Sequence, residues 1–165
     1  MKPLIIDNFL SKEEFNPLTD LVLNNFQWKY INYVDYADDE DKFQFIHRIY
    51  EDKKLFSPFH EIFNPIWNKI RPKEIYRVKA NLLIRTPEIV PNRFHIDIRE
   101  NWREIPYTTS IFYVNTNNGY TEFEDGTKIE SVANRFISFP VETKHRGTSC
   151  TDENIRVVIN FNYLT

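Results

Sequence analysis

The sequence has little glycine, a single cysteine and no long apolar run, and each shortage narrows the classes of protein it fits. Its 165 residues include three glycines, all in the last third, where we therefore expect the tight turns. Because Cys150 is the only cysteine, the chain cannot close an internal disulfide, and we expect a cytoplasmic protein. No stretch approaches the roughly 20 apolar residues of a membrane span, and the first ten residues lack the pattern of a signal peptide or anchor, so we expect no membrane partner.

The chain also lacks a surplus of basic charge. Lysine and arginine number 21 against 24 aspartates and glutamates, and the formal net charge is −3. Binding to a phosphate backbone requires a basic surface, so we expect no nucleic-acid partner. Hydrophobic residues make up 41% and aromatic residues 16% of a chain of single-domain length. We predict one domain over residues 1–165 with a core rich in phenylalanine and tyrosine.

The first 73 residues are predicted to be mostly helical and to act as support and lid for the rest. A short apolar run at 3–6 indicates a strand, and Ser11 then begins a capping box and a run with helical periodicity. A second helical pattern covers residues 57–70, where Pro65 must bend or divide the helix.

Residues 74–165 are predicted to form a β core. Short alternating or apolar runs follow one another with turn residues between them and no helical pattern, which favours an antiparallel sandwich or barrel. The N-terminal helices would then pack on its outside. Asp125-Gly126 stands where a hairpin turn is expected. The predicted strands cover residues 75–85, 108–115, 120–131, 134–141 and 155–164.

Two histidines and an aspartate form the candidate metal site. His95 and Asp97 stand two positions apart, so at a strand end they would share a face. His145 follows a predicted strand and would be the third ligand. Two histidines and one carboxylate on one face of a metal ion are the ligand set of non-haem Fe(II) oxygenases. A histidine with an acidic residue two positions on is a weak motif alone, and His145 also fits a surface histidine at a turn.

The last predicted strand alternates between an apolar set of residues and a polar one. The apolar side suits a core, and the polar side carries Arg156, Asn160 and Asn162. If the polar side faces water, the strand belongs to an ordinary sandwich exterior. If it faces a barrel interior, Arg156 is a buried cation that needs an anion, and its planar guanidinium suits a carboxylate. A dicarboxylate that chelates a metal at one end would have its other end held there.

Taken in order, these motifs resemble those of the 2-oxoglutarate- and iron(II)-dependent oxygenases, in particular the prolyl-4-hydroxylase-like branch found in bacteria and their phages. The matching runs are FHIDI, IFYVN, NGYTEFEDG, NRFISFPVETKHRG and IRVVINF, between about residue 75 and the C-terminus. The resemblance implies a double-stranded β-helix, a jelly roll of cupin type, in a bacterial or phage-infected cell. It also implies that His95, Asp97 and His145 bind Fe(II).

The resemblance further implies how 2-oxoglutarate binds. Arg156 would pair with its distal carboxylate, and Tyr113 would donate its hydroxyl to the same group. Thr121 would form part of the pocket wall, next to Asn118-Gly119, which stands where relatives have two glycines. Arg85 would make a further polar contact. Core packing explains Tyr113 equally well, and a solvent-facing side chain explains Arg85.

The implied activity uses O₂ and 2-oxoglutarate to hydroxylate a C–H bond, with succinate and CO₂ as coproducts and ascorbate as a stimulating reductant. The substrate would be a peptidyl proline or a small amino-acid-like metabolite, and no catalytic side chain is expected beyond the metal ligands. The alternative is a noncatalytic or cupin-like metal-binding β-helix protein that does not use 2-oxoglutarate. Residues 32–50 and 99–107 are expected to cover the iron, with Tyr33, Tyr36, His47 and Trp102 either lining a cleft or packing.

Overall fold

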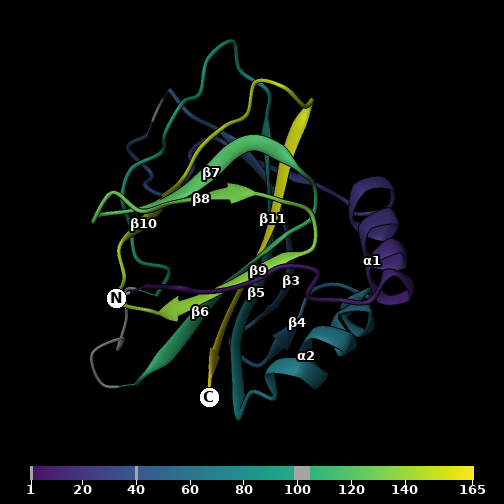
Figure 1. The fold of residues 1–165 in the computed structure, drawn as a ribbon. Coiled ribbons are helices and arrows are strands. Elements are labelled where there is room, and N and C mark those ends of the chain that lie inside the picture. The colour runs from purple at the N-terminus through teal and green to yellow at the C-terminus, as the bar shows by residue number, and fades with distance from the viewer. Residues whose placement is uncertain (1, 40, 99–104) are drawn as a thin grey trace.

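The computed structural model describes residues 2–39, 41–98 and 105–165, and in these ranges the strands form two antiparallel sheets (Figure 1). The main sheet has the strand order β1-β9-β6-β11-β5-β3-β2, with β4 paired to β3. Its strands are β1 (Leu4–Ile6), β2 (Lys29–Ile31), β3 (Gln44–Glu51), β4 (Lys54–Leu55), β5 (Glu74–Ile84), β6 (Tyr107–Tyr113), β9 (Arg135–Pro140) and β11 (Ile155–Leu164).

The minor sheet faces the inner side of the main sheet and has the order β10-β7-β8. Its strands are β7 (Asn117–Phe123), β8 (Lys128–Ser131) and β10 (His145–Gly147). The hairpin between β7 and β8 turns at Gly126, whose φ of 85° is in the left-handed region that glycine adopts without strain. The two antiparallel sheets face each other and together form the double-stranded β-helix that the resemblance implied.

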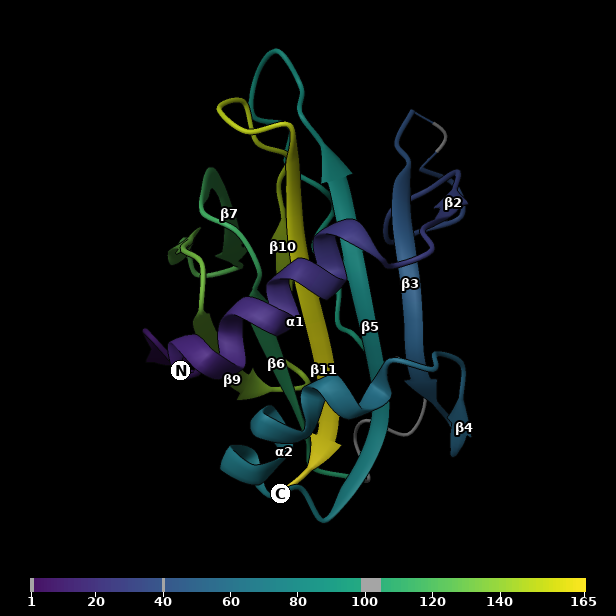
Figure 2. The same cartoon turned by 90° about the vertical axis from the view of Figure 1, so that its right-hand side faces the viewer.

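The helices cover the outer face of the main sheet, where Figure 2 shows them crossing in front of β11 and β5. Helix α1 (Lys12–Asn24) begins with the predicted capping box, in which Ser11 and Glu14 exchange hydrogen bonds of 3.3 and 2.9 Å. The second helical stretch is divided at Pro65, as predicted, into a 3₁₀ turn η1 (His60–Phe63) and helix α2 (Asn64–Ile70). No helix among the described residues is long and apolar enough to cross a membrane.

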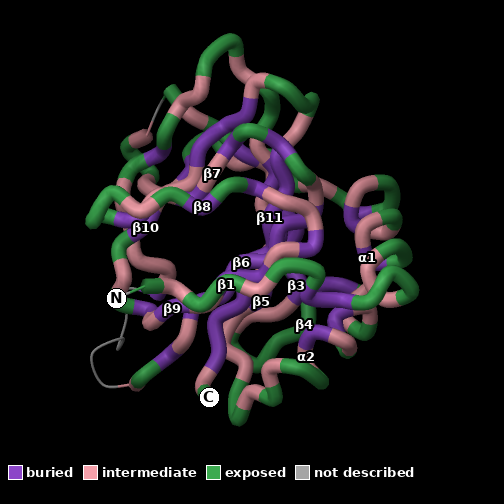
Figure 3. Tube along the Cα trace, in the orientation of Figure 1, coloured by how far each residue is buried: buried purple, intermediate pink, exposed green. Residues whose placement is uncertain are grey.

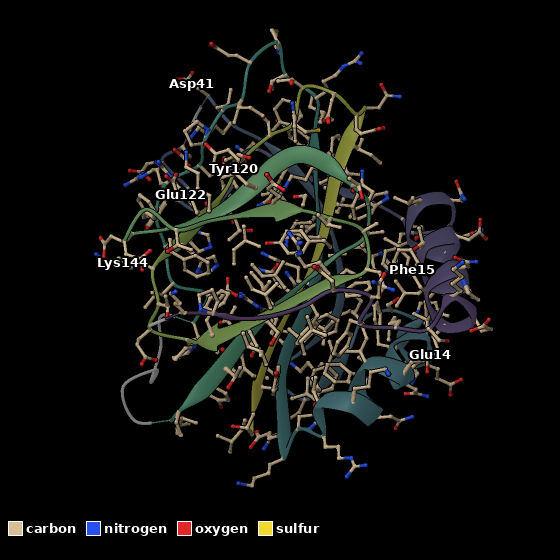
Figure 4. The ribbon with its side chains drawn as sticks, viewed as in Figure 1. Glu14, Phe15, Asp41, Tyr120, Glu122 and Lys144 are labelled. Atoms are coloured by element: carbon tan, nitrogen blue, oxygen red, sulfur yellow. The ribbon has the colours of Figure 1, made fainter. Side chains whose placement is uncertain are left out.

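The largest hydrophobic core lies between these helices and the main sheet. Figure 4 shows Phe15 on the side of α1 that faces the sheet, and its ring meets the edge of Phe112 with centroids 6.0 Å apart. The buried colour in Figure 3 is most continuous along the central strands, whereas the helices are largely intermediate or exposed. From β11 this core takes the apolar set of residues, Val157, Ile159, Phe161 and Tyr163. The polar set of the same strand therefore faces the space between the two sheets.

Strand β3 differs from the expectation that residues 1–73 are mostly helical. It pairs along most of its length with β5, so it belongs to the main sheet. The run from Gln44 to Glu51 alternates between residues that pack on the helices and residues that face inward, but the register shifts between Arg48 and Tyr50 and weakens the pattern. The β core therefore begins before residue 74.

Candidate active site

A short β-bridge brings the two candidate histidines together although they are far apart in the sequence. His95 donates its backbone N–H to His145 O (2.9 Å), and His145 donates its own to His95 O (3.0 Å). His145 begins β10, whose other edge pairs with β7. His95 and Asp97 therefore lie in a segment that runs along the edge of the minor sheet, and not at the end of a regular strand as the sequence predicted.

The side chains of His95, Asp97 and His145 converge on one point. Asp97 Oδ1 lies 3.6 Å from His95 Nε2 and 4.0 Å from His145 Nε2. One ligand atom from each residue lies within 4.8 Å of the other two. Two imidazole nitrogens and one carboxylate oxygen on one side of a metal ion form a facial triad, which leaves the opposite coordination positions open.

Hydrogen bonds on the far side of each ring direct the Nε2 atoms inward. His145 Nδ1 lies 3.1 Å from Thr143 O. His95 Nδ1 lies 3.3 Å from Arg93 O and 3.3 Å from the carboxylate of Asp35. An Nδ1–H that donates to an oxygen fixes the tautomer with a free Nε2 lone pair, which is how metal-binding histidines are usually held.

The main sheet holds the carboxylate of Asp97 in place. Asn162 Nδ2 donates to Asp97 Oδ2 (3.0 Å), and Asn160 Nδ2 lies 3.4 Å from the same oxygen. The guanidinium of Arg77 lies 3.4 Å from Asp97 Oδ1 and donates to Asp97 O at 3.1 Å. These contacts fix the carboxylate so that Oδ1 faces the two histidines.

The three ligands have shifted pKa values for different reasons. Burial opposes ionisation of Asp97, but the hydrogen bond from His95 and the charge of Arg77 outweigh it and hold its pKa well below the usual range. Burial would lower the pKa of His95, but the carboxylates of Asp35 and Asp97 raise it to about 9. Burial and the charge of His95 lower the pKa of His145 to about 4.

Arg156 lies between the sheets, is 3% exposed and has no carboxylate within ion-pair distance in the described part of the chain. Its Nε donates to Ser131 Oγ (2.8 Å), and a terminal nitrogen lies 3.3 Å from Thr121 Oγ1. Thr121 Oγ1 also accepts the hydroxyl proton of Tyr113 at 2.8 Å. Burial lowers the pKa of the Arg156 guanidinium. A buried cation without a counter-ion is costly, so this position favours binding of an anion.

Two glycines make room for the Arg156 side chain. A Cβ at Gly119 would lie 2.7 Å from Arg156 Cδ and 2.7 Å from Ser149 O, both too close for carbon. A Cβ at Gly147 would lie 3.3 Å from an Arg156 terminal nitrogen. The glycine at 119 is therefore required by the close approach of the arginine and a backbone carbonyl.

No protein-family model and no curated protein matches the sequence. Several solved structures, however, are similar to this chain in fold. A 2OG-Fe(II) oxygenase family oxidoreductase from Burkholderia pseudomallei superposes with a TM-score of 0.72 over 98% of this chain and 84% of that one, at 12% identity. The chain has the fold of the 2OG-Fe(II) oxygenases.

Two prolyl hydroxylases have the same oxygenase fold. One, from Trichoplax adhaerens, was solved with a peptide fragment of the hypoxia-inducible factor oxygen degradation domain; its TM-score is 0.72 at 16% identity, over 98% of this chain and 83% of that one. The other is the viral collagen prolyl hydroxylase of Paramecium bursaria Chlorella virus-1, with a TM-score of 0.62 at 16% identity, over 100% of this chain and 90% of that one. The resemblance stated from the motifs is confirmed at the level of the fold.

One cavity of about 480 Å³ in the oxygenase fold contains both halves of the site. The three triad residues line it together with Arg156 and Thr121. Tyr113 is fully buried behind Thr121 and directs its hydroxyl at that residue.

The structure does not bring Arg85 to the cavity. Strand β5 ends at Ile84, so the inward alternation stops one residue short of Arg85, which is exposed.

The segment after β2 lies against the residues that carry the triad, as expected for part of the cover of the site. Tyr36 donates its hydroxyl to Phe94 O (2.9 Å), and Arg93 pairs with Asp38 (2.9 Å) while its guanidinium stacks over the Tyr36 ring. These contacts place the carboxylate of Asp35 beside His95.

The other aromatic residues expected near the iron have different positions. Tyr33 lines the cavity. His47 does not, because it faces the outer core, where it stacks on Phe26 and contacts Ser57 Oγ at 2.8 Å. Trp102 lies outside the described residues.

Sequence reasoning missed Asp35, Arg77 and Lys79 as residues of the site. Asp35 lies next to the acidic run that was interpreted as a solvated loop, and nothing local distinguishes it from its neighbours. Arg77 and Lys79 carried a usable signal. They alternate with Val78 and Ala80 on β5, so they share the inward face in the way that Arg156 and Asn160 do on β11.

Proposed function

We propose that the protein is a 2-oxoglutarate- and Fe(II)-dependent dioxygenase that hydroxylates a C–H bond and releases succinate and CO₂. The observation that supports this most strongly is Arg156, a buried guanidinium without a carboxylate partner in the described residues that shares a cavity with a facial triad. Iron alone would give no reason for this arginine. A dicarboxylate with one end on the metal and the other on the guanidinium accounts for both.

The residues of the site fit both Fe(II) and 2-oxoglutarate. His95 Nε2, His145 Nε2 and Asp97 Oδ1 would hold Fe(II), whose preference for imidazole and carboxylate they satisfy. Arg156 would bind the distal carboxylate of 2-oxoglutarate by charge-assisted hydrogen bonds, with the Thr121 hydroxyl beside it. Bound Fe(II) and 2-oxoglutarate supply the oxidising power with which O₂ hydroxylates an unactivated C–H bond.

The chain's own side chains would position these groups and exclude water. Asn160, Asn162 and Arg77 keep the Asp97 carboxylate oriented toward the metal. The Asp35 carboxylate and the Arg93 carbonyl keep the His95 ring directed inward. No side chain is assigned the role of general acid or base. Stimulation by ascorbate and a cytoplasmic location stay predictions.

Two classes of substrate are compatible with the site, a peptidyl proline and a small amino-acid-like metabolite. The Trichoplax hydroxylase was solved with a peptide, and fold similarity alone extends a prolyl substrate to this chain. A small amino-acid-like metabolite fits a cavity of about 480 Å³ that also has to contain 2-oxoglutarate. The alternative of a cupin-like or purely binding protein leaves Arg156 without a role.

Turnover of 2-oxoglutarate tests the proposal. Protein purified without metal and given Fe(II), O₂ and 2-oxoglutarate should release succinate and CO₂ in equal amounts. Asp97→Ala should abolish this because it removes a metal ligand. Succinate release that persists at the wild-type rate in Asp97→Ala, or that is absent from folded protein with bound Fe(II), contradicts the proposal.

A further inference from the structure

A row of inward-facing polar side chains crosses the main sheet next to the metal site. In the strand register, Lys79 on β5 lies opposite Asn160 on β11 and opposite Arg48 on β3. Residues opposite each other in antiparallel strands have Cα atoms roughly 4.5–5.5 Å apart. Since the Asn160 amide lies 3.4 Å from Asp97 Oδ2, Lys79 is one strand away from a metal ligand.

Lys79 differs from the cations around it in its contacts with the described part of the chain. Arg48 pairs with Glu51 at 3.2 Å, and Arg77 contacts Asp97 at 3.4 Å. For Lys79, a cavity-lining residue, the described part of the chain provides no hydrogen bond and no ion pair. Burial, and next the charge of Arg77, lower its pKa to about 8, although the more distant charges of Asp97, Asp35 and Glu51 act in the opposite direction. A lysine kept in a cavity at this cost is explained if a ligand supplies the missing anion.

The charged residues that line the cavity also indicate that its ligand supplies an anion. Its described residues include four cations, namely Arg48, Arg77, Lys79 and Arg156. They include three carboxylates, namely Asp35, Glu51 and Asp97. Fe(II) and the 2-oxoglutarate dianion carry equal and opposite charges, and His95 is neutral when it binds the metal, so the loaded state adds no net charge to these seven residues. Counted over its described residues, the loaded cavity keeps one uncompensated positive charge, which a monoanionic substrate would neutralise.

A hydrogen-bond acceptor stands beside this lysine. Asn160 Oδ1 is buried without a hydrogen-bond partner in the described residues, while its Nδ2 is directed at Asp97. A buried carbonyl oxygen of this kind is usually satisfied. A substrate N–H near the carboxylate would satisfy it.

We propose that the substrate binds through a carboxylate that pairs with Lys79, with a neighbouring N–H donated to Asn160 Oδ1. This inference rests on the proposed oxygenase function and names the chemical class of its substrate. Anchoring the carboxylate one strand from Asp97 directs the carbon chain of the substrate toward the open coordination positions of the metal. The carboxylate can belong to a free N-substituted amino acid or to an acidic side chain of a peptide.

Paired ligands that differ only in charge test the proposal. Under anaerobic conditions, the protein loaded with Fe(II) and saturated with 2-oxoglutarate is titrated by calorimetry with N-acetylleucine and N-acetylglutamate, which both carry an N–H beside a carboxylate. The corresponding carboxamides, a capped peptide with one internal glutamate and the same peptide with glutamine in its place are titrated in the same way. The variants are Lys79→Met, which removes the charge, Lys79→Arg, which retains it, and Lys73→Met, which removes an exposed lysine elsewhere.

The expected result is that acids bind and carboxamides bind at least about tenfold more weakly, the loss of one charge-assisted hydrogen bond. Lys79→Met should lose this preference, whereas Lys79→Arg and Lys73→Met should keep it. Binding of the glutamate peptide without the free acids would support the proposal with a peptide as the source of the carboxylate. The proposal is overturned if neither a free acid nor the glutamate peptide binds more tightly than its carboxamide counterpart, or if Lys79→Met retains the preference.

Failure of this inference can be told apart from failure of the oxygenase assignment. The absorption band of Fe(II) chelated by 2-oxoglutarate is recorded on the same samples before each titration. If the band forms in wild type and in Lys79→Met but carboxylates are not preferred, only the substrate class is wrong. If the band does not form in wild type, the oxygenase assignment itself fails and the substrate class falls with it.

Discussion

Replacing Arg156 by methionine should affect stability and 2-oxoglutarate binding differently. The guanidinium is 3% exposed, lacks a carboxylate partner in the described residues and is held by two hydroxyl oxygens. An apolar side chain in place of a buried charge typically leaves stability unchanged or raises it by about 1–4 kcal/mol. The loss of two hydrogen bonds to hydroxyls offsets roughly 1 kcal/mol of this gain. The free energy of unfolding without ligand should therefore change by between about −1 and +3 kcal/mol.

The same substitution should greatly weaken 2-oxoglutarate binding. Leaving one partner of a buried ion pair without the other costs about 3–5 kcal/mol, which corresponds to a fall in affinity of roughly 10²- to 10⁴-fold. Urea unfolding without ligand and anaerobic calorimetry with Fe(II) and 2-oxoglutarate measure the two effects. Arg135→Met is the control, because Arg135 pairs with Asp7 outside the cavity. An Arg156→Met protein that is several kcal/mol less stable yet binds 2-oxoglutarate normally would refute the reasoning.

Three further predictions follow from the neighbours of the metal ligands and of Arg156. Asp35→Asn should lower Fe(II) affinity about 10- to 100-fold in a metal titration, because its carboxylate orients a histidine ligand. Gly119→Ala should lower 2-oxoglutarate affinity more than about tenfold, because the added methyl displaces Arg156. In metal-free protein, Lys79→Met should be more stable than wild type at pH 7. Wild type should recover this difference between about pH 8 and the ordinary lysine pKa near 10.5, since in that window its unfolded state binds more protons.

Each of these three predictions can be contradicted by a specific experimental result. Asp35→Asn with unchanged iron affinity would mean that the Arg93 carbonyl alone orients His95. The control for Gly119 is Gly126→Ala, where a methyl meets nothing within 4 Å but the φ of 85° strains it. Equal loss of 2-oxoglutarate affinity in both glycine variants would count against a specific contact. Wild-type stability that falls, and does not rise, above pH 8 relative to Lys79→Met would show that Lys79 is not desolvated.

The parts of the site that sequence reasoning found have signals within short stretches of the chain. The alternation in β11 separates a core face from a polar face, and the structure shows that the polar face is buried between the sheets with Arg156 on it. His95 and Asp97 are two positions apart, and His145 follows a recognisable strand. Spacing made these residues candidates, and the resemblance to the 2-oxoglutarate- and iron(II)-dependent oxygenases assigned their roles.

The residues that were missed depend on contacts between distant segments. Asp35 meets His95 only because the segment after β2 is bound by Tyr36 and Arg93 to the triad segment, a pairing that no local pattern encodes. Strand β3 takes its place through its pairing with β5. Arg85, which the resemblance implied as a cosubstrate contact, follows the last residue of β5 and is exposed, in line with the alternative of a solvent-facing side chain.

Anaerobic visible absorption of the protein with Fe(II), before and after addition of 2-oxoglutarate, tests the central claim most directly. Chelation of Fe(II) by the keto acid should produce a weak charge-transfer band that requires both components and is lost in His145→Ala. The absence of a band from folded protein that has bound both Fe(II) and 2-oxoglutarate would contradict the account, since the dicarboxylate would then not bridge the triad and Arg156.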